Sequence, residues 1–457
     1  MRKMLLLLLL APPAFAYNEA IHVLITRTAL PDARMLEPAT QQDLDAFRAL
    51  FWRNGMKTPD FARRYPTVES FDAWAFKEFL MLDPAARVHG IDQYDDQAMQ
   101  RGELLALASR WPDDDWRNRN RYLRDPRTHQ VVQASDGSPM PYDPATLDFG
   151  GLSGPTSQGH AHYGIIDGPL SDDPEVLKKD PRRFAVPPTA HAYGPEFVQL
   201  YTDLSALAAE NGSDWLAATF AGAAFHHLED VCNQIHTVQV GIYEFFESAY
   251  LQSKLRDLQT LGGLLGERRS LKQIGLRLIA NHHLLSEDLF ARRHQGAPQS
   301  DPLLQPKPSA LLLTKEIIDI SSQEAPQVYR LAWTFSAKAL RDGVRGHEYE
   351  SNKDDPERYV DASKVDAMNR FTELEERGLG RAVAALRLWN NQTPGDARHD
   401  PVPELIAYHA AAAKRRAGYV PAGQEALAIA WGYPAAAAAL LLVGLALFIR
   451  SRLSKRS

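Results

Sequence analysis

The sequence predicts a mostly helical protein built around one central helix that carries metal-ligand residues. Several runs have the apolar periodicity of helices, and they span residues 194–210, 270–293, 311–343 and 365–389. The stretch from Ser213 to His236 is apolar and alanine-rich, and its first residues favour a helix start. Two helices of this set also carry a histidine and a carboxylate at helical spacing, a pattern from which helical bundles build metal sites.

The N-terminus predicts a secretory signal peptide over residues 1–16. Two basic residues precede the leucine run Leu5–Leu10, and Ala14 and Ala16 form a small-residue cleavage site before Tyr17. An uncleaved anchor is the alternative, but the apolar run is too short to span a bilayer.

The C-terminus predicts a single membrane-spanning helix. Residues 426–449 are almost uninterrupted apolar sequence, long enough to cross a bilayer. The basic tail 450–457 follows at once, and positive flanks stay on the cytoplasmic side. We therefore expect an exported protein, held in the cell membrane by one pass with residues 17–425 outside the cytoplasm (in the periplasm of a Gram-negative cell). A buried alanine-rich core helix is the alternative for the apolar segment.

Charge and cysteine usage narrow the function classes. The formal net charge is −6, and the exported part is more acidic still because the signal and the tail are both basic. An acidic exported part gives no generic electrostatic attraction to nucleic acid. Cys232 is the only cysteine, so no intramolecular disulfide forms despite the oxidising route. We expect it to be a small buried core residue, with a metal-ligand role as the weaker alternative.

The central motif contains His226, Asp230 and His236. His226 and Asp230 are one helical turn apart and project from the same face, which makes a half-site for a cation such as zinc. His236 lies about 80° around an unbroken helix from His226. It joins the same site only if the helix bends or ends near residues 232–235, or it serves a neighbouring metal. A buried helix with satisfied histidines is the plainer alternative.

His283 and Glu287 repeat the same spacing on the predicted helix 270–293. Two such pairs on two helices are more informative than one, because a bundle can bring facing pairs together around a metal. The second pair therefore strengthens the prediction of a metal site.

Further candidate ligands come from the beginning and middle of the chain. Cleavage after Ala16 would give Tyr17 a free α-amine five residues before His22, so that the amine and the imidazole could chelate one metal. A helix-like run over 102–110 is expected to end at Trp111-Pro112, and a carboxylate of the following acidic group could face the metal. A loop-like stretch contributes alternating histidines. The acidic ligand could be Asp113, Asp114 or Asp115, and the histidine ligand from the loop could be His160 or His162.

These residues together resemble the superfamily of zinc-dependent phospholipase C and the fungal-type single-strand nucleases. The family pattern is a processed N-terminal aromatic residue, an early His, an Asp, a His-aromatic pair, His-x3-Asp-x5-His and His-x3-Glu. This chain offers the same order in Tyr17, His22, Asp113, His162-Tyr163, His226/Asp230/His236 and His283/Glu287. It departs from the pattern where Tyr17 stands in place of Trp and Gln234 in place of Pro.

The resemblance implies an all-α, multi-helix domain over residues 17–300 with a cleft that holds up to three zinc ions. The segment 301–425 would be a helical C-terminal extension before the transmembrane helix. One ion would be bound by Asp113, His162, His226 and Asp230, the second by His236, His283 and Glu287, and the third by the Tyr17 backbone, His22 and Asp230. Asp113 could also orient or deprotonate the attacking water.

Three functions compete on this basis. The first is a membrane-anchored, exported zinc-dependent phosphodiester hydrolase of phospholipase C type, whose tether would hold the cleft near phospholipid headgroups. The second is an extracytoplasmic single-strand nuclease, which would need aromatic stacking positions and a local basic groove; Trp111, Trp116, Tyr163 and Arg117 are its candidates. The third is a zinc-stabilised, non-catalytic binding protein. The sequence does not decide the oligomeric state.

Overall fold

The computed structural model describes residues 19–71, 98–119, 194–237, 285–294, 298, 304–336 and 356–391. Within these residues the protein is mostly helical, as the sequence predicts. The predicted signal peptide 1–16 and membrane span 426–449 lie outside them. Among the helices that are described, none is both long and apolar enough to cross a membrane.

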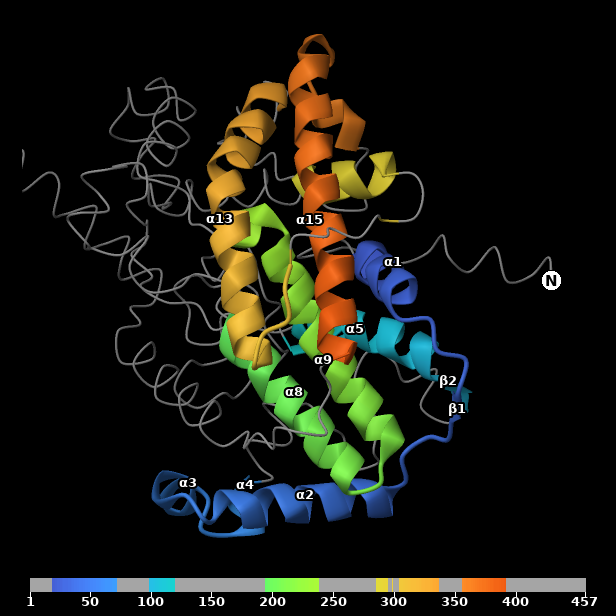
Figure 1. Ribbon diagram of the computed structural model, residues 1–457, viewed down its shortest axis with the longest axis vertical. Helices are drawn as coiled ribbons and strands as arrows, with labels where there is room; N and C mark the ends of the chain where they lie inside the picture. Colours follow the sequence, from blue (N-terminus) through green and yellow to red (C-terminus); the bar gives the residue numbers. More distant parts are fainter. Residues whose placement is uncertain are drawn as a thin grey trace, which may run out of the picture.

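The helices form a bundle in which α9 is central (Figure 1). It is flanked by α1, α5, α8, α13 and α15, while α2, α3 and α4 lie together at one end. The bounds are α1 Glu19–Ala29, α2 Gln41–Gly55, α3 Pro59–Arg64, α4 Val68–Phe71, α5 Arg101–Arg119, α8 Gly194–Glu210, α9 Asp214–Cys232, α13 Ala310–Phe335 and α15 Val365–Asn391. Residues 285–293 are also helical. Three short turns complete the helical elements: η7 Gln234–His236, η10 Pro356–Tyr359 and η11 Ala362–Lys364.

Helix α9 is buried on all sides, which explains its unusual composition. Every residue from Leu216 to Cys232 except Ala217 is buried, so the alanine-rich run replaces the amphipathic pattern of a surface helix. Gly212, with φ of 80°, ends α8 in the left-handed region that favours glycine. The Ser213 amide then donates to Ala208 O, and Asp214 begins α9 with the acidic first turn that suits a helix N-terminus.

Helices α5 and α9 cross at very close range. A Cβ atom at Gly222 would lie 2.7 Å from the carbonyl oxygen of Leu105 and would clash with Ala108. The absence of a side chain at Gly222 therefore permits the approach.

Helix α5 also continues through Pro112 to Arg119, so the expectation that it ends at Trp111 is wrong. Trp111 and Pro112 are buried, and this packing outweighs the local cost of the proline.

Helix α1 is joined to α5 by a short sheet and by ion pairs. Strands β1 (Met35–Leu36) and β2 (Met99–Gln100) pair antiparallel, with Met35 opposite Gln100. Beside them, the Asp32 carboxylate accepts from Arg34 and from Arg101 at 3.2 Å. The hydrogen bond from the Arg34 side chain lowers the pKa of Asp32 to about 2. These contacts fix α1 against the start of α5, and α1 in turn lies beside α9.

Helices α13 and α15, from the predicted C-terminal extension, pack against α9 and its neighbours. Ser336 and Val360 form an isolated antiparallel bridge, so the end of α13 lies near the start of α15. At its other end, α15 donates a hydrogen bond from Trp389 Nε1 to Thr202 Oγ1 of α8 at 2.8 Å, and the Trp389 ring meets Phe225 of α9 edge-on. The two helices therefore enclose α9 and share its core.

Candidate metal centre

Helix α9 presents His226 and Asp230 on one face, in the interior of the bundle. Both side chains are fully buried, and His226 Nε2 lies 3.3 Å from Asp230 Oδ2. The spacing of four residues places them one turn apart on the same side. The helix therefore supplies two rigidly spaced donors to one point in the core.

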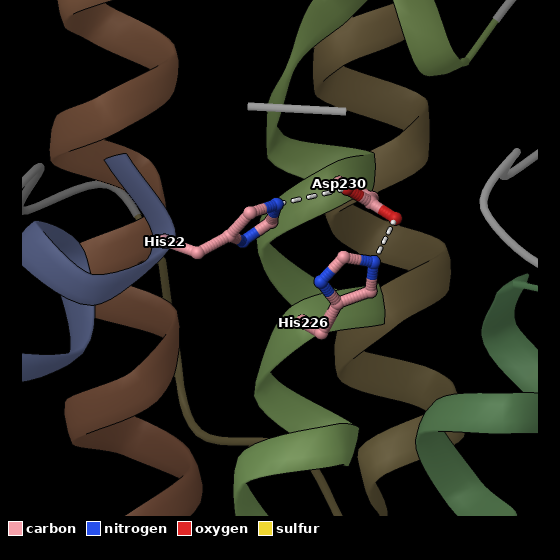
Figure 2. Close-up of side chains that lie close together, drawn as sticks. All are labelled: His22, His226 and Asp230. Carbon is pink, nitrogen blue, oxygen red and sulfur yellow. Dashed lines mark ion pairs between the residues drawn. The ribbon is translucent and has the colours of Figure 1, made fainter. Parts of the chain in front are cut away.

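Helix α1 brings His22 to the same point. His22 Nε2 lies 3.5 Å from Asp230 Oδ1, with both side chains fully buried. The rings of His22 and His226 are stacked with centroids 4.3 Å apart. Figure 2 shows the two histidines directed at different oxygens of the one carboxylate. One ligand atom of each residue lies within 4.8 Å of the others, which makes this group a candidate metal centre.

A second carboxylate holds His22 from the opposite side of its ring. His22 Nδ1 lies 2.5 Å from Glu229 Oε2, and Thr26 Oγ1 donates to Glu229 Oε1 at 2.8 Å. Metal-binding histidines commonly donate their other ring nitrogen to a carboxylate, which fixes the tautomer and the ring orientation. The contact with Glu229 therefore leaves Nε2 of His22 directed at Asp230.

His226 is held in a similar way by the backbone of α5. Its Nδ1 lies 2.7 Å from Ser109 O. With Nδ1 engaged by a carbonyl, His226 carries its proton there and offers the lone pair of Nε2 to a metal.

Burial controls the protonation of Glu229. The loss of solvation raises its pKa well above the ordinary value, the Thr26 hydrogen bond opposes this, and the charge of Asp230 adds to it. Without a nearby cation, it costs free energy to keep two adjacent buried carboxylates both charged. A cation beside Asp230 would relieve this repulsion.

A second His/carboxylate pair lies where α9 ends. His236 Nε2 is 3.2 Å from Glu287 Oε1, and both residues are buried. The nearby carboxyl of Glu375 on α15 is also buried. Burial raises the pKa of Glu375 to about 8; the charges of Glu287 and Glu324 add to the rise, and Arg381 opposes it.

The distances separate two kinds of contact around these histidines. Charge-assisted hydrogen bonds are usually about 2.7–2.9 Å long, and the contacts to Glu229 and Ser109 O fall at or below that range. The three remaining His/carboxylate pairs lie at 3.2–3.5 Å. Two ligands at about 2.1 Å from a tetrahedral zinc ion lie roughly 3.4 Å apart. The His22–Asp230 and His226–Asp230 spacings therefore fit two donors on one zinc ion in each case, whereas the His236–Glu287 contact at 3.2 Å is also a hydrogen bond.

The structure brings together some of the predicted ligands and leaves others outside its described part. His22, His226 and Asp230 form one group, and His236 and Glu287 form a separate pair. Asp113 lies on α5, together with Asp114 and Asp115, and only the backbone of these residues is described. The remaining predicted ligands lie outside the described residues; they are Tyr17, His162 with its alternative His160, and His283.

Sequence reasoning missed the residues that orient the histidines. Glu229 stands next to Asp230 and could have been suspected as a carboxylate inside an apolar helix, but nothing local indicates that its partner is in α1. The Ser109 carbonyl has no side-chain signal at all. Cys232 is buried, as expected. Trp111, one of the candidate base-stacking residues, is only 1% exposed and packs edge-on against Tyr201.

Fold and site define a class: a helical protein with a buried histidine–aspartate candidate metal centre at its central helix. Comparison of the chain with protein-family models, with curated proteins and with solved structures found no match. The geometry of the site therefore carries the functional argument.

Proposed function

We propose that the protein is a zinc-dependent phosphodiester hydrolase of phospholipase C type. One observation carries the proposal: the two oxygens of Asp230 face two different histidines, His22 at 3.5 Å and His226 at 3.3 Å. A carboxylate in that arrangement can bridge two metal ions, and multi-metal sites of this kind are typical of phosphoester hydrolysis.

The residues of the chain have separate tasks in this proposal. His22, His226 and Asp230 would bind metal, with Glu229 and Ser109 orienting the two imidazoles. His236 and Glu287 would contribute to a neighbouring ion together with His283. Bound zinc would neutralise the phosphodiester, lower the pKa of a bound water and stabilise the leaving oxygen. Asp113, four residues after Ser109 on α5, would orient that water or accept its proton.

The choice of a phospholipid substrate rests on the ends of the chain. The predicted C-terminal membrane helix would hold the site near lipid headgroups, and the acidic exported part does not favour a polyanionic substrate. Burial of Trp111 removes one of the stacking residues that a nuclease would use. Phospholipid is therefore the first substrate class to test, with single-stranded nucleic acid as the alternative.

The test measures metal and turnover on the same preparation. The full chain, purified after export and without chelator, is analysed for zinc and assayed on phosphatidylcholine vesicles and on single-stranded RNA. We expect bound zinc, release of phosphorylated headgroup, loss of activity with chelator and recovery with added zinc. Hydrolysis of RNA alone would establish the nuclease, zinc without any hydrolysis would establish a non-catalytic protein, and a chain without zinc would refute the proposal.

A further inference from the structure

The turn that follows α9 determines where His236 lies. Helix α9 ends at Cys232, and the Asn233 side chain accepts from the Ile235 amide at 3.2 Å to begin η7. The chain therefore leaves the helix axis before it reaches His236, whose Nε2 lies 3.2 Å from Glu287 Oε1. This ending is the condition under which His236 can bind a second ion beside the first.

Gln234, inside this turn, connects it to two other helices. Its Nε2 donates to Glu324 Oε2 of α13 at 2.9 Å and to Leu374 O of α15 at 2.7 Å. Gln234 is fully buried, so both hydrogen bonds form away from water and hold the turn from two directions.

Glu324 is itself fixed in place by arginine. Arg381 Nη2 lies 3.0 Å from Glu324 Oε2, and Arg377 Nη1 lies 3.1 Å from Oε1. Arg381 also donates to Ser321 Oγ at 2.8 Å, and Ser321 Oγ donates to Cys232 O at 3.5 Å. The contacts thus form a closed ring from the end of α9 through α13 and α15 to Gln234.

Simple packing gives no reason for such a ring. Taking an arginine and a glutamate out of water is costly, and apolar side chains of similar volume often replace buried ion pairs without loss of stability. Arg381 is only 2% exposed and Gln234 is fully buried. What the ring provides, and what apolar packing would not, is a fixed direction for the turn between Asn233 and His236.

We infer that Gln234, held by the Glu324–Arg381 pair, is the positioning residue that directs His236 toward Glu287. Helices α13 and α15 are then part of the second half-site, although they supply none of its predicted ligands. The inference rests on the proposed function where it takes His236 and Glu287 as metal ligands; the direction of the His236 ring can be observed without a metal.

The test therefore begins with metal-free full-length protein labelled with 15N at histidine. Gln234→Met keeps the length of the side chain and removes both donated hydrogen bonds. We expect the imidazole 15N signals of His236 to shift and broaden in this variant, while those of His22 and His226 stay unchanged. The control is Thr314→Val, which removes a buried hydroxyl whose hydrogen bond, to Ala310 O, lies within α13.

Zinc affinity gives the second readout. Loss of an orienting contact around a ligand typically weakens metal binding about 10–100-fold. We expect Gln234→Met to weaken one class of zinc site by about tenfold and to spare the other. If this variant does not fold, Glu324→Gln tests the same link with a smaller expected shift, because the amide oxygen can still accept from Gln234.

The outcomes separate this inference from the proposed function. Unchanged His236 signals in folded Gln234→Met overturn the inference whether or not zinc binds. Equal shifts in Thr314→Val also overturn it, because the effect would then follow from general loosening. If the His236 signals shift in Gln234→Met but the wild-type chain binds no zinc, the positioning role is supported and the hydrolase is refuted.

Discussion

Glu229 and Asp230 are neighbours in the chain, yet they contact opposite edges of the same imidazole. His22 Nδ1 lies 2.5 Å from Glu229 Oε2, and His22 Nε2 lies 3.5 Å from Asp230 Oδ1. The short contact is a hydrogen bond, and the longer one has the separation of two ligands on one ion. The pair of carboxylates therefore assigns different tasks to the two nitrogens of His22.

Replacing His226 by alanine should abolish metal binding at this centre. His226→Ala removes a buried ligand of the ion that His226 and Asp230 would share, and zinc that loses a protein ligand is bound much less tightly. Phosphodiester hydrolysis should fall to background, with zinc content and turnover as the measurements. Export should be unaffected.

The neighbouring histidine provides the matched control. The ring of His227 stacks on Tyr201 and lies against Phe197. It also meets the His226 ring edge-on, with centroids 5.1 Å apart, but His227 is not a member of the metal group. His227→Phe therefore keeps a buried aromatic ring at this position of α9 and removes only its imidazole nitrogens. This variant should keep wild-type zinc content. Wild-type zinc in His226→Ala, or zinc loss in both variants, would contradict the assignment.

Glu229→Gln should weaken metal binding without abolishing it. The amide retains an oxygen that can accept from His22 Nδ1, but it cannot carry the negative charge that a bound cation would stabilise on Glu229. Contacts of this kind are worth about 10–100-fold in metal affinity. Competition with a chelator measures the change. Thr26→Val removes only the hydrogen bond from Thr26 Oγ1 to Glu229 and should weaken metal binding less. A larger effect than that of Glu229→Gln would argue against a chain of contacts that runs from Thr26 through Glu229 to His22.

Gly222→Ala should destabilise the protein, although alanine is the better helix former. The added methyl group has no space, since its carbon would lie 2.7 Å from Leu105 O and would overlap Ala108. Helix α5 must move, at a cost of about 1–3 kcal/mol, and Ser109 O moves with it from His226. Thermal unfolding and zinc affinity should both decrease. Ala217→Ser, at a half-buried position of the same helix, should change neither.

The stability of the metal-free protein should depend on pH through the ionisation of Glu375. Burial raises its pKa from 4.5 to about 8, so the folded state retains a proton that the unfolded state releases. The free energy of unfolding should therefore decrease as the pH rises from about 4.5 to about 8, by roughly 1.4 kcal/mol for each unit of pKa shift. Glu375→Gln removes this ionisation, and denaturant titrations across that range should show a flatter dependence. Parallel curves for the two proteins would contradict the prediction.

The sequence predicts those parts of the site that depend on local geometry. Helical spacing is enough to place His226 and Asp230 on one face of α9, and the start of that helix near Ser213 agrees with the structure. The end of the helix is harder to predict, because no proline precedes His236. The ending depends on Asn233, whose side chain accepts from the backbone two residues later, a tendency that is weak in sequence alone.

The parts that could not be predicted depend on distant segments. Helix α5 passes through Pro112 because its buried face packs against α9, an effect that no local propensity contains. Glu229 meets a partner 207 residues away, and the donor to Glu324 comes from a turn 90 residues earlier. Such contacts follow from the tertiary arrangement of the helices.

The two histidine-containing groups are joined by a backbone segment of seven residues, from Asp230 to His236. One end of this segment is a helical turn and the other is the capped turn η7, so both ends have a defined backbone conformation. The number of residues in the segment therefore determines the separation between the two groups. Insertions could accumulate in surface connections of related chains at little cost. A single residue added between Cys232 and Gln234 would turn His236 away from Glu287, so the interval from Asp230 to His236 is where any functional relative must match this chain in length.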